Sequence, residues 1–292
     1  MKANLTRRDF LAICGLGLTV GLAGCGNNSA ASSSSKPSSS PSASDSASAD
    51  SSSSSNDYHL VKPGKLTLIS EFYYPPFTSI DPNTKEYVGF DVDLYKEVCK
   101  RLDLEENILP SVQFDTIVPT IKQGGKADIS FGAITITDER KEEVAMTDPY
   151  LDSNQSIVVK KGSSVAKPED LNTSGTQVAV QAGTTSEDWA RENLTNATIV
   201  TLDDIIQALT GVQSGLYNAC VVDLPVAEYE IKEAYSDLEI PDDCQIPTGE
   251  QVGAVINKNN IALLKAVNKA LKDIKDDGTE DELEKKWFGT TL

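Results

Sequence analysis

From residue 65 onward, short apolar runs of the strand type alternate with amphipathic helical stretches, and this alternation limits what the chain can fold into. The expected strands are residues 65–70, 111–114, 127–133, 156–160, 177–181, 199–202, 218–223 and 253–256. The expected helices are residues 91–103, 116–123, 186–193, 202–213, 225–234, 261–275 and 281–287. Repeated β-α units predict an α/β fold with mostly parallel sheets. Ligands bind such sheets beyond the carboxyl ends of the strands, so the loops after the strands are the candidate site.

Two of these loops carry groups that suit a carboxylate. Thr135 and Arg140 follow the third expected strand, and a guanidinium can grip a carboxylate through two parallel hydrogen bonds. Gly183, Thr184 and Thr185 follow the fifth expected strand and open a helix. Glycine and hydroxyl residues at a helix N-terminus favour a bound anion. Both loops therefore predict a binding site for a carboxylate.

Two other loops carry acids. Asp223 ends the strand at 218–223 and can accept an ammonium group. Glu71 follows the first strand and stands beside Tyr74 on a proline-rich turn. Two anion-holding elements and an acid, all at strand ends, predict a receptor for a zwitterion such as a free amino acid.

Each of these residues also has a plain structural interpretation when it is taken alone. Arg140 could pair with Glu139 or Glu143 on the surface, and Asp223 could cap the helix that follows it. The two threonines could be simple helix caps. Their joint placement at strand ends favours the binding-site interpretation.

Longer motifs extend the pattern over the folded region. They are Tyr74-Pro75-Pro76-Phe77, Val88-Gly89-Phe90-Asp91-Val92-Asp93-Leu94, residues 128–140, Thr147-Asp148-Pro149-Tyr150, Val180-Gln181-Ala182-Gly183-Thr184-Thr185, Val221-Val222-Asp223 and Lys286-Trp287-Phe288-Gly289. In combination they resemble the solute-binding proteins of polar amino acid ABC transporters, over about residues 66–289. That resemblance implies the type-II periplasmic-binding-protein fold, with two lobes joined by hinge crossings near 151–154 and 246–251.

The implied lobes divide the chain unevenly. Residues 58–151 and 250–292 would form a discontinuous first lobe, and residues 152–249 the second. Ligand binding would close the two lobes about the hinge, because contacts across the cleft stabilise only the closed form.

The resemblance also implies roles at the backbone end of the ligand. The carbonyl of Gly132 and the hydroxyl of Thr135 would take part of the ammonium, and Asp223 would complete that site from the opposite lobe. Arg140 would clamp the α-carboxylate, and Thr185 with nearby amides would cap it.

At the other end of the ligand, Tyr74 and Phe114 would pack on either side of its side chain, and Glu71 would contact that side chain and select for it. Ala133 departs from the family pattern, because some members have serine there and would gain a polar contact. The acid at Glu71 and the acidic chain favour a basic ligand such as arginine or lysine, while cystine and glutamine also suit it.

The N-terminal region predicts where the protein works. A cationic start and an apolar stretch of 15 residues, 10–24, are too short for a membrane-spanning helix and are typical of a signal peptide. Leu22-Ala23-Gly24-Cys25 resembles a lipoprotein processing site, which would leave Cys25 lipidated, with palmitate among its acyl chains. Residues 6–11 resemble a twin-arginine motif, so export by that route or by general secretion stays open.

A serine-rich tether is predicted to follow the lipidated residue. Serine makes up 17 of the 27 residues in 29–55, and no large apolar side chain is present to drive folding. The expected division is a signal peptide at 1–24 and a lipidated, disordered linker at 25–57. A linker of this length reaches about 30 Å, which keeps a module near a membrane partner.

Composition excludes several functions. The net charge is −18, or −20 without residues 1–24, which argues against binding to nucleic acid. His59 is the only histidine, so a histidine-containing catalytic triad or a His/Cys metal site is not expected, and no cofactor is predicted. Cys99 is expected to be a buried thiol, whereas Cys220 and Cys244 could pair in an oxidising compartment.

The sequence thus predicts a monomeric, membrane-tethered binding protein outside the cytoplasm, which is not an enzyme and which delivers an amino acid to a permease. Two other interpretations stay open. A dehydratase of the same fold could use Glu71 and Asp223 as acids on a small cyclic carboxylic acid. A tethered sensor could instead present its liganded state to a receptor.

Overall fold

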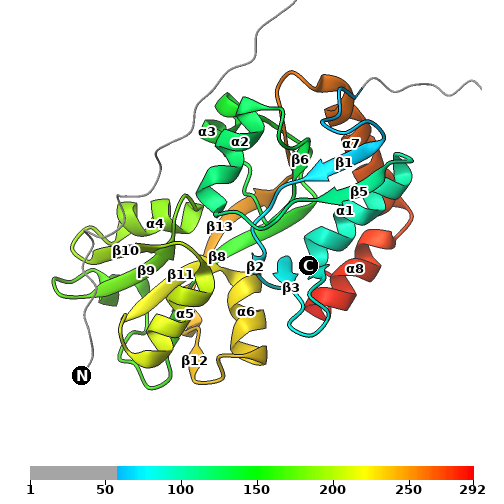
Figure 1. Cartoon of the computed structure of the whole chain (residues 1–292). Coiled ribbons are helices and arrows are strands. Elements are labelled where there is room, and N and C mark those ends of the chain that lie inside the picture. Colours follow the sequence, from blue (N-terminus) through cyan, green and yellow to red (C-terminus); the bar gives the residue numbers. More distant parts are fainter. Residues whose placement is uncertain (1–57) are drawn as a thin grey trace, which may run out of the picture. The chain divides into compact units, whose positions relative to one another are not determined.

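The computed structural model describes residues 58–292, and Figure 1 shows these residues as two lobes with strands β8 and β13 running between them. Each lobe is a central sheet flanked by helices, so the α/β, two-lobed fold is confirmed. The expectation of mostly parallel sheets is wrong, because both central sheets mix parallel and antiparallel pairs. The predicted signal peptide, Cys25 and serine-rich linker lie outside the described residues.

The first lobe contains a five-stranded sheet in the order β5-β1-β6-β14-β7. The strands are β1 Lys65–Leu68, β5 Glu105–Ile108, β6 Ile129–Ser130, β7 Ala145–Met146 and β14 Val255–Ile256. β1 runs parallel to β5 and β6, and β14 runs antiparallel to β6 and β7. The helices of this lobe are α1 Phe90–Arg101, α2 Ile117–Gln123, α3 Asp138–Glu143, α7 Ile261–Asp276 and α8 Thr279–Phe288.

The second lobe is built on the order β10-β9-β11-β8-β12, with β13 paired to β8. Its strands are β8 Leu151–Lys160, β9 Gln177–Gln181, β10 Thr198–Leu202, β11 Ala219–Asp223, β12 Leu238–Glu239 and β13 Gln245–Val252. Its helices are α4 Thr185–Asn193, α5 Ile205–Ser214 and α6 Leu224–Glu233. Here too a parallel block, β9 to β11, adjoins antiparallel strands.

The two hinge crossings are the paired strands β8 and β13. Leu151 pairs with Val252, and Gln155 pairs with Ile246, so the crossings run antiparallel and side by side. The register shifts between Ile246 and Glu250, which marks a bulge in β13. A bulged pair of strands can bend there without losing the rest of its ladder.

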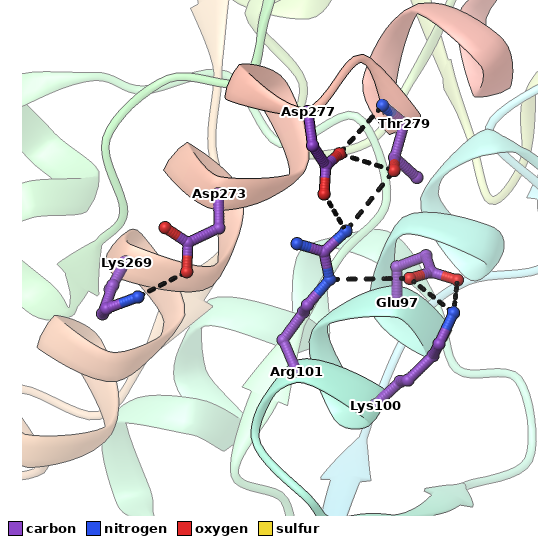
Figure 2. A network of polar contacts seen from close by, with 7 residues as sticks. All are labelled: Glu97, Lys100, Arg101, Lys269, Asp273, Asp277 and Thr279. Atoms are coloured by element: carbon purple, nitrogen blue, oxygen red, sulfur yellow. Dashed lines mark hydrogen bonds and ion pairs between the residues drawn. The ribbon is translucent and has the colours of Figure 1, made fainter.

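The chain returns to the first lobe through β13, and polar contacts hold the C-terminal helices α7 and α8 against α1. Arg101 donates to Asp277 at 2.6 Å and also contacts Thr279, across the turn between α7 and α8 (Figure 2). Asp93 on α1 accepts from the ammonium of Lys286 and the indole of Trp287 on α8. These contacts join segments almost 200 residues apart in sequence and so hold the discontinuous lobe together.

One expected strand is wrong. Residues 111–114 form no strand; β5 lies earlier, and Phe114 begins a short 3₁₀ helix that ends at Thr116. β5 is an edge strand paired only with β1, so the side chains of Glu105 and Glu106 face solvent. An edge strand needs no apolar run, which is why hydrophobic patterning missed it.

Other elements lacked a sequence signal. A small sheet of β2 Tyr73–Tyr74, β3 Thr78–Ile80 and β4 Tyr87–Val88 was not expected, nor were β12 and the full length of β8 and β13. These short or hinge strands are too brief or too polar to produce a clear period.

The three cysteines in the described region are free and buried. Cys220 and Cys244, whose pairing the sequence left open, therefore do not form a disulfide. Cys220 packs in the core on one face of β11, whereas Cys244 packs with Ala219 and Val221 on the other face. Side chains alternate across a strand, so these two sulfur atoms lie on opposite sides of the sheet.

Candidate functional site

The predicted residues converge on a cavity between the lobes. It is small, with a cavity volume of ≈ 10 Å³, about the room that one water molecule needs. The lining residues are Tyr74, Phe114, Ala133, Thr135, Arg140, Gln181, Thr184, Thr185 and Asp223. Seven of the nine predicted site residues line it; Glu71 and Gly132 lie just behind the lining.

On the first lobe, a strained loop presents Ala133 and Thr135. Ala133 has a φ of 50°, and Gly132 has a φ of 153° with space for no side chain, because a Cβ there would lie 2.7 Å from the hydroxyl of Ser70. The buried carboxylate of Asp91 accepts from the Ala133 amide at 2.6 Å and from the Tyr150 hydroxyl at 3.0 Å. Asp91 therefore fixes the loop and ties it to the residue that precedes β8.

Arg140 reaches from α3 across the cleft. The Thr137 side chain caps α3 by accepting from the Arg140 amide. The guanidinium donates to the carbonyl of Thr135 at 2.7 Å and, on the second lobe, to the carbonyl of Gly183 at 3.0 Å. It also lies over the ring of Phe114, 5.4 Å from the centroid. Two of its five N–H donors are used in these contacts, which leaves others for a carboxylate in the cavity.

The plain interpretation of Arg140 as a surface ion-pair partner is not supported. Glu143 pairs with Lys122 instead. Burial lowers the pKa of Arg140, while Asp223 and Asp188 raise it. The guanidinium stays charged, because its ordinary pKa lies far above neutral pH.

The second lobe presents the N-terminus of α4 to the cavity. The Thr184 side chain accepts from the Glu187 amide and donates to the carbonyl of Gln181 at 2.8 Å. This cap sets the start of the helix, with Thr185 as its first residue. The Thr185 hydroxyl lies 3.4 Å from the Thr135 hydroxyl of the first lobe. Unpaired amides and the positive end of the helix dipole make this end of α4 suited to a carboxylate.

Asp223 stands at the end of β11 and is 6% exposed. Its carboxylate accepts from the Tyr74 hydroxyl at 2.7 Å, across the cleft, and from the amide of Gln155 at 2.7 Å. It makes no side-chain cap for α6, so the plain interpretation of Asp223 as a helix cap is wrong. The pKa of Asp223 is raised to about 6, chiefly by burial and also by the charge of Glu250, although the hydrogen bonds from Tyr74 and Gln155 lower it.

Glu71 is buried and bonded to a lining residue. The Gln181 amide nitrogen donates to its carboxylate at 2.6 Å, from lobe to lobe. The pKa of Glu71 is raised to about 8, chiefly by burial and also by the charges of Asp204 and Asp115, against the hydrogen bond from Gln181, which lowers it. The amide oxygen of Gln181 is buried without a hydrogen-bond partner in the described structure, so it is an acceptor available to a ligand.

Several residues of this site were missed from the sequence. Gln155, Gln181, Ser186 and Glu250 join the hydrogen bonds around Asp223, Thr185 and Glu71. Gln155 stands two residues before the apolar run 157–159 of β8, and a polar side chain so close to an apolar strand was the one available signal.

No group of three or more metal-ligating side chains occurs within residues 58–292. No helix in that range is long and apolar enough to span a membrane. The groups at the cavity are a guanidinium, a helix N-terminus and carboxylates, which suit a small zwitterion.

A family model for bacterial extracellular solute-binding proteins, family 3, matches residues 66–290 of the chain. The chain belongs to this family. Membership implies a location outside the cytoplasm. Relatives are named as components of amino acid ABC transporters.

Two curated relatives show the range of ligands in the family. The ABC transporter glutamine-binding protein GlnH of Bacillus subtilis is 32% identical over 210 residues, covering 71% of this chain and 75% of the relative. The L-cystine-binding protein TcyJ of Escherichia coli is 30% identical over 231 residues, covering 78% and 84%.

Solved structures share the fold. An ancestral arginine-binding protein bound to arginine is 36% identical with a TM-score of 0.72, covering 77% of this chain and 99% of that one. The ancestral amino acid-binding protein AncCDT-1, described as a precursor of cyclohexadienyl dehydratase, is 40% identical with a TM-score of 0.71, covering 77% and 96%.

Proposed function

We propose that this family member binds a free L-amino acid between its lobes and delivers it to the permease of an ABC importer. The observation that carries the proposal is one cavity with opposite charges at separate points. Arg140 and the N-terminus of α4 suit the α-carboxylate, and Asp223 suits the α-ammonium. A carboxylate that bonds both Arg140 and Thr185 would join the lobes.

We propose a basic amino acid, arginine or lysine, as the ligand. Glu71, Asp223 and Glu250 give the cavity and its second layer three carboxyl groups against the guanidinium of Arg140. A cationic side chain would favour the charged forms of these groups, including Glu71, whose pKa of about 8 keeps it largely protonated at neutral pH without a ligand. Glu71 and the unpartnered oxygen of Gln181 are both acceptors, which suits a side chain rich in N–H donors.

A thermal-shift screen of the purified protein against the twenty amino acids and cystine tests the proposal, because a ligand of the native state raises the Tm. We expect arginine and lysine to give the largest increases and calorimetry to show a single site. A largest increase with glutamine or cystine would overturn the basic ligand but keep the function. No response to any amino acid would overturn the function itself.

A dehydratase of small cyclic carboxylic acids is the second candidate. Its supporting observations are the likeness to AncCDT-1 and the pKa of about 8 for Glu71, which keeps a proton-donating carboxyl group near the cavity at neutral pH. Incubation with cyclic hydroxy acids and detection of water loss by chromatography separates the candidates. We expect no turnover, and a rate that disappears in Glu71→Gln would favour the enzyme.

We further propose that the protein is a monomer held by a lipid on Cys25 at the outer face of the cytoplasmic membrane. Cys25→Ala should move it from the membrane fraction to the soluble fraction, and light scattering should give the mass of one chain. Copurification with a permease supports transport, whereas copurification with a receptor kinase would support the sensor interpretation.

A further inference from the structure

Gln155 lies behind the second-lobe wall of the cavity, where its side chain is bonded to the lining residues Thr185 and Asp223. Its side chain is 0% exposed, and its residue pairs with Asp223 of β11 on one side and Ile246 of β13 on the other. Its amide nitrogen lies 2.7 Å from Asp223 Oδ1, 2.7 Å from Glu250 Oε2 and 3.2 Å from Thr185 Oγ1. Its amide oxygen accepts from the Ser186 hydroxyl at 2.5 Å.

These partners fix which way the amide faces. Carboxylates only accept hydrogen bonds, so the nitrogen must face Asp223 and Glu250. The hydroxyl of Ser186 can donate, and it meets the oxygen. One buried side chain thus connects the acid at the end of β11 to the first turn of α4.

We infer that Gln155 is the positioning residue that holds Asp223 and the N-terminus of α4 in their binding geometry. The inference rests on the proposed function, in which Asp223 binds the ammonium and α4 binds the carboxylate. A ligand meets both groups at once, so their separation must be set before it binds. Such preorganisation increases affinity because less ordering is needed on binding.

Gln155 also favours the charged form of Asp223. The groups that face this carboxylate are the Tyr74 hydroxyl, Gln155, Glu250 and Arg140. Burial and Glu250 raise its pKa, whereas the hydrogen bonds from Tyr74 and Gln155 and the charge of Arg140 lower it. Without the Gln155 amide, the pKa of Asp223 must rise, and the acid is neutral over a wider pH range.

The same amide reaches the hinge. Glu250 lies on β13 directly after the bulge, opposite Ser153 of β8. The ammonium group of a ligand that attracts Asp223 therefore also affects the Gln155 amide nitrogen, which is bonded to Glu250 of β13, the second hinge crossing. This contact links occupancy of the site to the pair of strands that must bend.

Calorimetric titration of Gln155→Met with L-arginine, L-glutamine and L-cystine between pH 5.5 and 8.5 tests the inference. Methionine keeps the length of the side chain and removes the amide. We expect at least a tenfold loss of affinity at pH 7 and a pH midpoint of binding that moves upward. Gln251→Met is the matched control, because Gln251 bonds Asp152 between the same two strands away from the cavity; its affinity and pH profile should match the wild type.

Unchanged affinity and pH profile in Gln155→Met would overturn the inference alone. No binding of any amino acid by the wild-type chain would overturn the proposed function and the inference together. If Gln155→Met does not fold, Ser186→Ala removes only the bond that orients the amide. It should move the pH midpoint in the same direction by a smaller amount, and an unmoved midpoint would contradict the inference.

Discussion

The two halves of the cavity are held in different ways. On the first lobe, Ala133 and Thr135 lie in a loop whose backbone turns through positive φ at Gly132 and Ala133, and the buried carboxylate of Asp91 holds the Ala133 amide. On the second lobe, Asp223 and the start of α4 are fixed by side-chain hydrogen bonds through Gln155. Changes to the first-lobe loop should therefore reduce stability, and changes to the second-lobe network should reduce affinity in a chain that stays folded.

Asp223→Ala should give the largest effect on binding. Removing a charged partner of a buried ammonium weakens affinity by roughly 100-fold or more. The fold should persist, because burial holds this carboxyl at a raised pKa and so makes it a cost to stability at neutral pH. Calorimetry measures the affinity and circular dichroism the Tm. Near-normal affinity would remove Asp223 from the site, and an unfolded variant would break the contrast between the halves.

Gly132→Ala should mainly reduce stability. The added Cβ would lie 2.7 Å from the Ser70 hydroxyl in a conformation that favours glycine, at a cost of about 1–3 kcal/mol. Gly125→Ala is the control for a positive φ without a clash: its φ is 77°, against 153° at Gly132, and no atom lies within 4 Å of the new Cβ. Chemical denaturation measures the free energy of unfolding of both variants. Equal losses would show that the clash adds nothing at the site.

Glu71→Gln should change selectivity rather than stability. Arginine should lose about tenfold in affinity with the loss of a charged hydrogen bond, while glutamine should bind nearly as before. In the wild type, a cationic side chain beside Glu71 should lower its pKa of about 8, so arginine binding at pH 7 should release a proton. Calorimetry in buffers of different ionisation enthalpy measures that release. If no proton is released, the ligand side chain does not lie beside Glu71.

Glu230→Gln should give the smallest effect, within the second lobe and away from the cavity. Burial alone raises the pKa of Glu230 to about 7, so the folded state keeps a proton that the unfolded state releases from about pH 4.5. Stability should therefore fall as pH rises between about 4.5 and 7, and level off above that range. The variant should melt a few degrees higher than the wild type at pH 8 and differ less at pH 4. An unchanged difference between the two pH values would contradict this origin.

Much of the fold followed from apolar patterning, because β9, α4, α5 and β11 bury one or both faces. β5 was not predicted from this patterning, because an edge strand needs no apolar run. Arg140, Thr185 and Asp223 were predictable since strand ends converge in an α/β sheet. Gln155 was not, because its partners Thr185, Asp223 and Glu250 lie 30, 68 and 95 residues away and only the folded chain brings them together.

The central claim is that a ligand α-carboxylate joins Arg140 of the first lobe to α4 of the second. Calorimetric titration with L-arginine and with agmatine, which lacks only that carboxylate, tests it most directly. We predict binding of arginine at a single site and at least 100-fold weaker binding of agmatine, a difference that should shrink in Arg140→Ala. Equal affinity for the two compounds in the wild type would contradict the account.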